Sequence, residues 1–150
     1  MELEIREAAL TPALTETLIR LSADWEAEDS CRGYRKNGPG DLEGNRVFLL
    51  EGDGEVLGYL FGHRELAKNS SSVMRDGTPC FEVEELYVKP AFRGRGWGAA
   101  LFRAAEAAVR DEAEIILLST ATKNWRAILH FYLEELDMSF WSARLFKRLK

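Results

Sequence analysis

The sequence lacks the features of exported, membrane-spanning and metal-binding proteins. No apolar run approaches the ~20 residues that a helix needs to cross a membrane. The first residues, MELEIREAAL, have neither the basic start nor the apolar centre of a signal peptide. The two cysteines, Cys31 and Cys80, have no CxxC spacing and no histidine-rich neighbourhood. We therefore expect reduced thiols, no metal site and a cytoplasmic location.

Positive charge is also scarce. The 150 residues carry 20 Lys and Arg against 25 Asp and Glu, which gives a formal net charge of −5. Nucleic-acid-binding surfaces are normally basic, so this balance argues against a nucleic-acid partner, and no segment suggests a membrane partner. A cationic substrate fits the charge better. The length suits a single domain over residues 1–150.

The apolar pattern predicts a mixed α/β fold. Thr11-Pro12 is typical of a helix start, and two apolar runs joined by Gly-Asp-Gly indicate a hairpin. The polar stretch 66–79 is either a binding loop or a plain surface connection. In chain order we predict a strand (3–8), a helix (12–25), a short helix and loop (26–45), the hairpin (46–65), a strand (80–88), a helix (98–110), a strand covered on both faces (114–120), a helix (124–136) and a last strand (139–149).

Gly94, Gly96 and Gly98 stand at alternate positions between a predicted strand and a predicted helix. They fit the dinucleotide-binding pattern G-x-G-x-x-A only formally, because a proline-containing segment separates them from the strand and no acidic residue ends the next strand. The Gly-Lys-Ser/Thr of nucleotide hydrolases is absent. Bare amide groups at the positive end of a helix, flanked by Arg93 and Arg95, favour a pyrophosphate ligand. A glycine-rich turn that only starts a helix is the alternative.

The stretch EELYVKPAFRGRGWGAALF resembles the acetyl-CoA-binding core of the GNAT superfamily of N-acyltransferases, whose signature is Arg/Gln-x-x-Gly-x-Gly/Ala. The signature occupies residues 93–98 here and follows the expected apolar strand. The order of elements also resembles that of the family over most of the chain. The resemblance implies a mixed, mostly antiparallel sheet flanked by helices, with a V-shaped opening between the fourth and fifth strands.

The resemblance also implies that acetyl-CoA binds as a co-substrate. The backbone of Leu86, Tyr87 and Val88 would pair with the pantetheine arm like an added strand, and Asn124 would contact the same arm. The pyrophosphate would be held by the loop that starts the helix, which consists of Arg93, Gly94, Arg95, Gly96, Trp97 and Gly98.

Acetyl transfer to an amine requires a group that takes a proton from the ammonium, whose pKa is about 10. The strand FEVEELYV carries Glu82, Glu84 and Glu85, and central strands seldom bury charge. Strict alternation would place Glu85 on one face with Val83 and Tyr87, and the other two acids on the opposite face. Glu84 and Glu85 are our candidates for the base or a substrate anchor. Solvated acids on a partly exposed strand are the alternative.

The resemblance further implies a tyrosine, on the helix after the fifth strand, that protonates the departing thiolate. In the family this tyrosine comes seven positions after the asparagine. Here Tyr132 comes eight positions after Asn124, and Phe131 occupies the seventh. A shift of one residue turns a side chain by about 100° on a helix. Tyr132 is our candidate for the acid, with a packed aromatic side chain as the alternative.

The first helix region and the loops between strands would form the acceptor site. The segment 23–44 is rich in acids, which favours a small cationic amine, such as an aminoglycoside or a polyamine, or a lysine-bearing peptide. Family members usually have a hairpin after the last helix, whereas one strand is predicted here, so a homodimer partner could cover the sheet edge. A catalytically silent acyl-CoA-binding module and a dinucleotide-binding oxidoreductase are the other functions considered.

Overall fold

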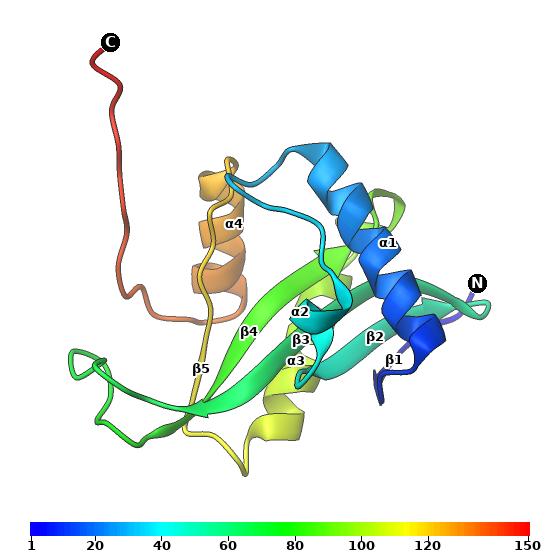
Figure 1. Cartoon of the computed structure of the whole chain (residues 1–150), viewed down its shortest axis with the longest axis horizontal. Helices are drawn as coiled ribbons and strands as arrows, with labels where there is room; N and C mark the ends of the chain where they lie inside the picture. The colour runs from blue at the N-terminus through cyan, green and yellow to red at the C-terminus, as the bar shows by residue number, and fades with distance from the viewer.

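A five-stranded sheet forms the centre of the molecule in the computed structural model, which describes residues 1–150 (Figure 1). The strands lie in chain order, and all neighbours are antiparallel except β4 and β5, which are parallel. The predicted mixed, mostly antiparallel sheet is therefore confirmed. The strands are β1 (Leu3–Ala8), β2 (Arg46–Gly52), β3 (Glu55–Leu66), β4 (Pro79–Val88) and β5 (Ile115–Leu117).

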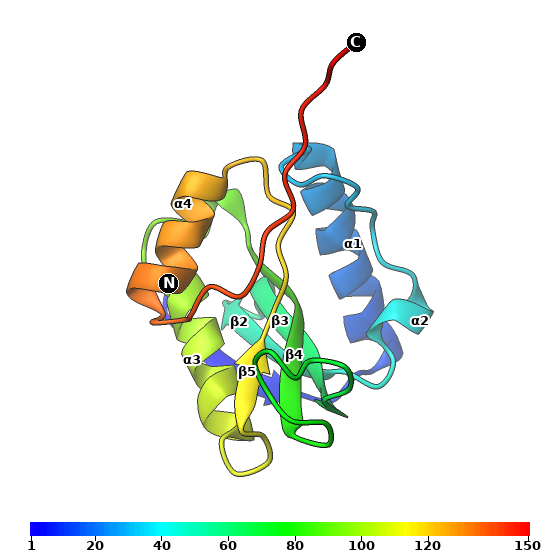
Figure 2. The same ribbon diagram turned by 90° about the vertical axis from the view of Figure 1, so that its left-hand side faces the viewer.

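Helices cover both faces of the sheet. α1 (Pro12–Glu28) and the short α2 (Pro39–Leu42) lie on one face, and α3 (Trp97–Val109) and α4 (Trp125–His130) lie on the other (Figure 2). α1 begins as predicted, because the Leu14 amide donates a hydrogen bond of 3.1 Å to the Thr11 hydroxyl and Pro12 follows at the first helical position. No helix is long and apolar enough to cross a membrane.

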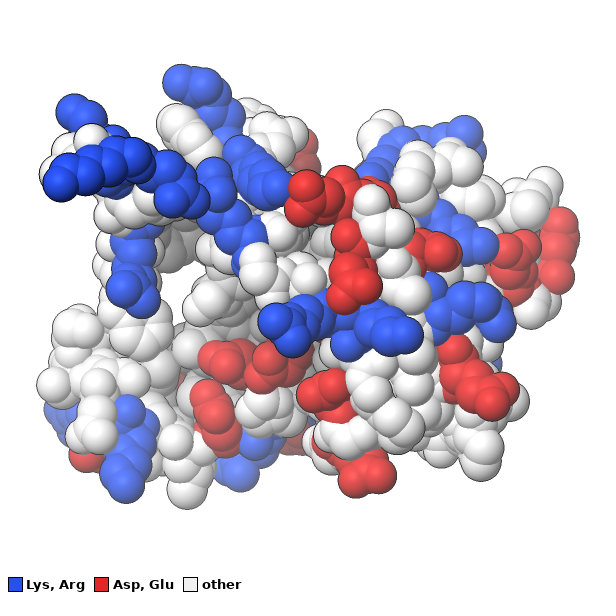
Figure 3. All heavy atoms as spheres, turned by 45° about the horizontal axis from the view of Figure 1, so that its top comes forward, with Lys and Arg blue, Asp and Glu red and all other residues white.

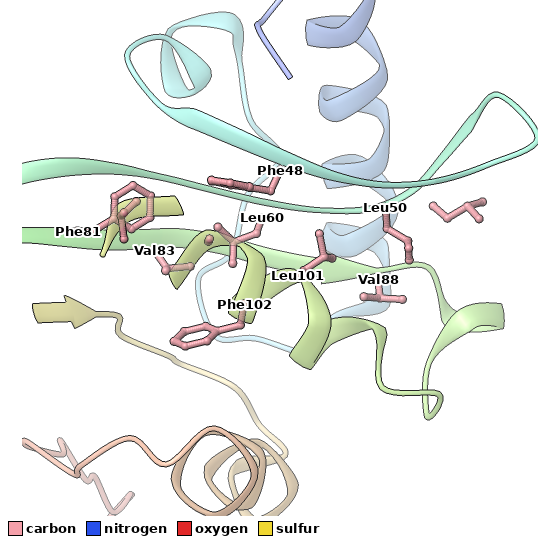
Figure 4. Close-up of a cluster of buried hydrophobic side chains, with 11 residues drawn as sticks. Phe48, Leu50, Leu60, Phe81, Val83, Val88, Leu101 and Phe102 are labelled. Carbon is pink, nitrogen blue, oxygen red and sulfur yellow. The ribbon is translucent and has the colours of Figure 1, made fainter. Parts of the chain in front are cut away.

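Two apolar clusters hold these layers together. On the α3 side, Leu101 and Phe102 pack against Phe48, Leu60 and Val83 of the sheet (Figure 4). Burying a Leu or Phe side chain contributes about 1.5–3 kcal/mol relative to leaving it exposed, so this packing fixes where α3 starts. The cluster on the α1 side consists of Leu18, Leu21, Leu42, Val47, Leu49, Tyr59, Phe61 and Tyr87.

A β-bulge in β4 changes which glutamates share a face. β3 pairs with Glu85 and then directly with Val83, so Glu84 is an extra residue without a partner of its own. Val83 packs in the α3-side cluster and Tyr87 in the α1-side cluster. The expected alternation, which put Glu84 and Glu85 on opposite faces, is therefore wrong, because a bulge shifts the alternation by one residue. Both glutamates instead line one cavity.

The chain after α4 does not form the predicted strand over 139–149. The backbone of residues 139–150 makes no hydrogen bond, and every side chain in this segment is exposed. β5 is also shorter than predicted and only half-buried, because no further strand lies on its outer side. The hairpin of β2 and β3 and the absence of regular structure over 67–78 agree with prediction.

Candidate active site

The β4–β5 pair opens in a V after three residue pairs. β4 is paired with β5 only over residues 80–82, whereas it continues to Val88 with β3 as its single strand partner. The other backbone edge of β4 therefore has no strand partner along Leu86, Tyr87 and Val88, although the Val88 carbonyl accepts a hydrogen bond from the Arg93 side chain. An extended ligand arm can add to such an edge as a strand does.

The loop before α3 presents a row of free amide groups. Gly94 and Gly96 have φ angles of 74° and 85°, left-handed conformations that glycine adopts at little cost. None of the amide groups from Gly94 to Ala99 donates a hydrogen bond within the protein, and the last of them lie at the positive end of the α3 dipole. A cradle of consecutive free amides is suited to phosphate groups.

The other residues of this loop differ in what they offer a ligand. The Arg95 side chain is exposed and forms no ion pair, with the Phe92 ring 5.8 Å from its guanidinium carbon. The Trp97 side chain packs against the α3-side cluster. A Cβ on Gly98 would lie 3.5 Å from the Phe131 ring of α4. Arg95 therefore supplies free positive charge, whereas Trp97 and Gly98 fix the first turn of α3 against its neighbours.

Arg93 already has partners within the protein. Its Nε donates to the Val88 carbonyl at 2.7 Å, and its Nη1 and Nη2 lie 2.8 and 3.0 Å from the Glu28 carboxylate. The Tyr87 hydroxyl donates to the same carboxylate at 2.9 Å. Burial opposes the ionisation of Glu28, but these hydrogen bonds and the charge of Arg93 lower its pKa below the ordinary value. The Arg93 side chain thus ties the glycine loop to β4 and α1.

Glu85 is a largely buried carboxylate fixed by three donors. The hydroxyls of Tyr59 and Tyr34 donate to its Oε1 at 2.8 and 2.9 Å, and the side-chain amide of Asn37 donates to the same atom at 3.1 Å. Oε2 accepts no hydrogen bond. Burial raises the pKa of Glu85 above its ordinary value in spite of these bonds. A fixed carboxylate with a raised pKa and one free oxygen is suited to accept a proton near neutral pH.

The donors to Glu85 are themselves held in place. The Tyr34 ring stacks on Trp25 with the ring centroids 4.3 Å apart. Asn37 is buried, and its backbone amide donates to a serine hydroxyl of α1 at 2.9 Å. Burial and the charge of Glu85 raise the pKa of both Tyr34 and Tyr59, so both hydroxyls keep the protons that they donate.

A cavity of about 510 Å³ lies beside the two glutamates, between α2 and strands β3 and β4. Asp41 and Glu43 reach it from the acidic segment 23–44, so four carboxylates border it together with Glu84 and Glu85. The Nδ1 atom of His63 lies 3.5 Å from Glu84. This excess of carboxylates favours a positively charged ligand. The other lining residues are Asn37, Gly44, Asn45, Phe61 and Arg64.

Tyr132 lies at the start of a wide helical turn. The residues that follow α4, Phe131–Glu135, form a π-helical turn in which the Leu136 amide donates to the Phe131 carbonyl at 3.0 Å. The extra residue of this π turn lies after Tyr132, because the bonds of Ile128 to Asn124 and of Phe131 to Ala127 are those of an ordinary α-helix. The one-residue shift in the spacing of Tyr132 therefore remains. The Tyr132 ring packs edge-on against Phe102, with the centroids 6.4 Å apart.

The loop that follows α1 meets the segment that follows β5 on the same side of the molecule as Tyr132. Burial raises the pKa of Tyr132 to about 12, with a smaller contribution from the Cys31 thiol of that loop. Cys31 pairs with Thr122 in an isolated bridge, and Lys123 forms an ion pair of 3.0 Å with Asp29. The loop after α1 and the segment after β5 therefore meet at the wide end of the V (Figure 1).

Asn124 begins α4 next to this bridge. Its backbone amide donates to the Thr122 hydroxyl at 3.1 Å, and its carbonyl accepts from the Ile128 amide at 3.1 Å. Its side-chain amide is exposed and makes no hydrogen bond within the protein. The side chain is therefore available to a ligand in the opening.

Sequence reasoning missed the residues that hold and surround the candidate glutamates. Tyr34, Asn37 and Tyr59 fix Glu85, and His63 lies beside Glu84. These residues lie on β3 and on the segment between α1 and α2, far from β4 in the sequence. No local pattern predicts such contacts. The only available signal is that Tyr34 and Asn37 fall within the segment 23–44, which we assigned to the acceptor site.

Comparison with known proteins assigns the chain to a class of acyl-transferring enzymes. The model of the acetyltransferase (GNAT) family matches residues 12–138. The chain belongs to this family and is an acyltransferase. No curated protein sequence matches it.

Solved structures share the fold at low sequence identity. The putative acetyl transferase from Pyrococcus furiosus has a TM-score of 0.70 and 16% identity, covering 99% of this chain and 100% of that chain. The aminoglycoside acetyltransferase HMB0005 from an uncultured soil metagenomic sample has a TM-score of 0.70 and 18% identity, covering 100% of both chains. AAC(6')-Iy, in complex with the bisubstrate analog CoA-S-monomethyl-acetylneamine, has a TM-score of 0.67 and 17% identity, covering 100% of this chain and 99% of that chain.

The raised pKa of Glu85 predicts a pH-dependent stability difference. Ionising Glu85 costs more free energy in the folded chain than in the unfolded chain. The free energy of unfolding of the wild type is therefore lowered by Glu85 as the pH rises from the ordinary carboxylate pKa through the raised pKa of Glu85. We expect Glu85→Gln, which cannot ionise, to gain melting temperature relative to the wild type as the pH rises from about 4, the ordinary carboxylate value, through neutrality. Thermal unfolding across this range measures the gain. Glu84→Gln, whose side chain is 42% exposed, is the control. If the melting temperatures of Glu85→Gln and the wild type change with pH in parallel, the claim that the pKa of Glu85 is raised is contradicted.

Proposed function

We propose that this enzyme transfers an acetyl group from acetyl-CoA directly to the amine of a small cationic acceptor. The observation that carries the proposal is the arrangement along β4. A row of free amides and the open edge of β4 lie at one end of the strand, and a carboxylate-lined cavity borders its bulge. A phosphate-bearing acyl donor and a cationic acceptor can therefore approach the same strand from two sides.

The residues of the opening fit the parts of CoA. The backbone of Leu86, Tyr87 and Val88 would pair with the pantetheine arm, and the Asn124 amide would bind the same arm from the other wall. The amides from Gly94 to Gly98 would hold the pyrophosphate, with Arg95 adding charge. Arg93 would keep the loop in place through Glu28. When bound, acetyl-CoA supplies the thioester-activated acetyl group.

Glu85 is our choice for the base. It is fixed through Oε1 and can take a proton from the acceptor ammonium on Oε2, whereas the more exposed Glu84 can anchor the positive charge. Only the ionised form of Glu85 accepts a proton, so turnover should rise as the pH passes through its raised pKa. Tyr132 is our choice for the acid, because a pKa of about 12 keeps its hydroxyl protonated at neutral pH.

The acceptor class rests on the four carboxylates of the cavity. Asp41, Glu43 and Glu84 can each pair with an ammonium, which suits a molecule with more than one amine, such as an aminoglycoside or a polyamine. HMB0005, which has the same fold, is described as an aminoglycoside acetyltransferase, which supports the same class. We also propose a cytoplasmic location, because both cysteines are free thiols, as a reducing compartment keeps them.

The direct test measures CoA binding by calorimetry and acetyl-CoA-dependent thiol release with a panel of amines. The panel contains an aminoglycoside, a polyamine and a lysine peptide, with a neutral polyol as the control. We expect CoA to bind and thiol release to require a cationic amine. Glu85→Gln should lower kcat by about 10²-fold without weakening CoA binding. Binding without turnover for every amine would favour a silent acyl-CoA-binding module. Absence of binding would contradict the role of the glycine loop.

Tyr132→Phe tests the proposed acid. The substitution removes one hydroxyl from a packed ring, so we expect little change in melting temperature and in CoA affinity. If the hydroxyl protonates the departing thiolate, kcat should fall by about 10²-fold. Steady-state kinetics with the best acceptor, together with calorimetry, separate the two effects. Full turnover in the variant would assign Tyr132 to packing alone.

A further inference from the structure

The segment 29–38, which joins α1 to α2 and which we call the strap, spans the wide end of the V. It leaves α1, reaches the segment after β5 and returns to α2 (Figure 1). Cys31 and Thr122 form an isolated antiparallel bridge there, flanked by two backbone hydrogen bonds. In one of them the Arg32 amide donates to the Ala121 carbonyl at 2.9 Å. The strap is therefore fastened to the wall of the opening that lies opposite β4.

The other half of the strap holds the candidate base on β4. The hydroxyl of Tyr34 and the side-chain amide of Asn37 donate to Oε1 of Glu85 at 2.9 and 3.1 Å. The Tyr34 ring is stacked on Trp25 of α1, with the centroids 4.3 Å apart, so the ring cannot turn without losing this contact. The strap thus joins a side chain of one wall of the opening to the backbone of the other wall.

A tight turn connects the bridge to Tyr34. Arg32 and Gly33 form the turn, and Gly33 has a φ angle of 73°. Glycine adopts this left-handed conformation at little cost, as the second central residue of a type II turn requires. Only this turn separates Cys31 from Tyr34 in the sequence. A displacement of the bridge would therefore be passed to the Tyr34 hydroxyl over a short piece of backbone.

The strap has one further contact, through the Arg32 side chain. Its guanidinium carbon lies 5.0 Å from the centroid of the Phe146 ring. Phe146 belongs to the segment 139–150, whose backbone makes no hydrogen bond, and the basic side chains of this segment project from the body of the molecule (Figure 3). A segment without support of its own cannot fix the strap. The anchor is therefore the backbone bridge and not the Arg32 side chain.

We propose that the strap is a positioning element for the acetyl transfer. Tyr34 positions the Glu85 carboxylate, and the backbone bridge at Cys31 anchors Tyr34. Tyr34 acts through Glu85, because it binds Oε1 and leaves Oε2 free for the proton of the acceptor. The same strap reaches the candidate acid, since the Cys31 thiol contributes to the raised pKa of Tyr132. The inference rests on the proposed function, in which Glu85 and Tyr132 transfer the protons.

The proton affinity of Glu85 reports whether the strap positions it. Burial raises the pKa of Glu85, and the three donated hydrogen bonds lower it in part, because a bond donated to a carboxylate favours the ionised form. Losing one donor should therefore raise the pKa of Glu85 further. The other titratable or charged groups that face Glu85 are unchanged in the variants below. They are Asp41 and Glu43 at α2, His63 and Arg64 on β3, and Glu84 on β4.

An NMR titration of the Glu85 side-chain carboxyl measures this pKa in the chain alone. Tyr34→Phe removes the donor and keeps the stacked ring. Arg32→Pro removes the bridge amide and suits the turn, because proline is common just before the glycine of a type II turn. We expect both variants to titrate Glu85 at higher pH than the wild type does. Arg32→Ala, which keeps the amide and loses the Phe146 contact, is the control and should titrate as the wild type does.

The double variant, Arg32→Pro with Tyr34→Phe, shows whether the bridge acts through Tyr34. Both substitutions remove the same hydrogen bond to Glu85, so the double variant should titrate as Tyr34→Phe does alone. Two shifts that add would mean that the bridge reaches Glu85 by another route. That result, or an Arg32→Pro variant that titrates as the wild type does, would overturn the proposal.

Thr122→Cys strengthens the bridge instead of removing it, and it decides the question if Arg32→Pro does not fold. The flanking hydrogen bonds are those of a non-hydrogen-bonded pair, in which the two Cα atoms are about 4.5 Å apart. Cys31 can therefore be oxidised to a disulfide across the bridge in this variant. A strap that only positions Glu85 should keep the titration of Glu85 and kcat after oxidation. Loss of kcat on oxidation, restored by a reductant, would show that the strap opens during turnover and would contradict a fixed positioning role.

Kinetics separate the hold of the strap on Glu85 from the proposed function. With the best acceptor, Tyr34→Phe should move the acidic limb of the kcat profile to higher pH together with the NMR titration, while the affinity for CoA stays unchanged. A titration that moves while the kcat profile does not would overturn the role of the strap in catalysis. If the wild type acetylates no amine, the proposed function and this role in it fail together, whereas the NMR titrations, which need no acetyl donor, still decide whether the strap holds Glu85.

Discussion

β4 remains paired with β3 along its length, while β5 leaves β4 after residue 82. This divergence has two structural consequences. It opens the backbone edge of β4 at Leu86, Tyr87 and Val88, and it leaves β5 as a short strand with a free outer edge. The glycine loop follows β4 after the short segment 89–93, so its free amides lie near the entrance of the opening. The ligand site that we propose therefore depends on where the β4–β5 pairing ends.

The electrostatic design of the site separates two kinds of charge along β4. Positive potential gathers at the end of the strand, from the free amides, the α3 dipole and Arg95. Negative charge gathers at the bulge, where Glu84 and Glu85 border the cavity. Keeping Glu85 ionised in a buried position is costly, and three donors from β3 and the α1–α2 segment offset part of that cost. Such a locally unfavourable group, supported by its surroundings, is common at functional sites.

Much of the architecture could be predicted from local patterns. The Thr11-Pro12 helix start, the Gly-Asp-Gly hairpin and the strand–glycine–helix unit are each set by neighbouring residues, and they fixed the order of elements. The bulge at Glu84 could not be predicted, because it depends on how two strands pair. The π turn at Phe131 and the donors to Glu85 likewise arise from tertiary packing. The last strand was wrong for a related reason, since residues 139–149 have the pattern of a strand but no partner within the chain.

The central claim is that the amides from Gly94 to Gly98 hold the pyrophosphate of CoA. The most direct measurement is an NMR titration of the ¹⁵N-labelled chain with CoA, with pantetheine, which lacks the pyrophosphate, as the control. The account predicts large, saturable shifts of these amide resonances with CoA only, and shifts of Leu86 to Val88 with both ligands. If CoA binds and the resonances of the glycine loop do not move, the pyrophosphate lies elsewhere and the account of the site is contradicted.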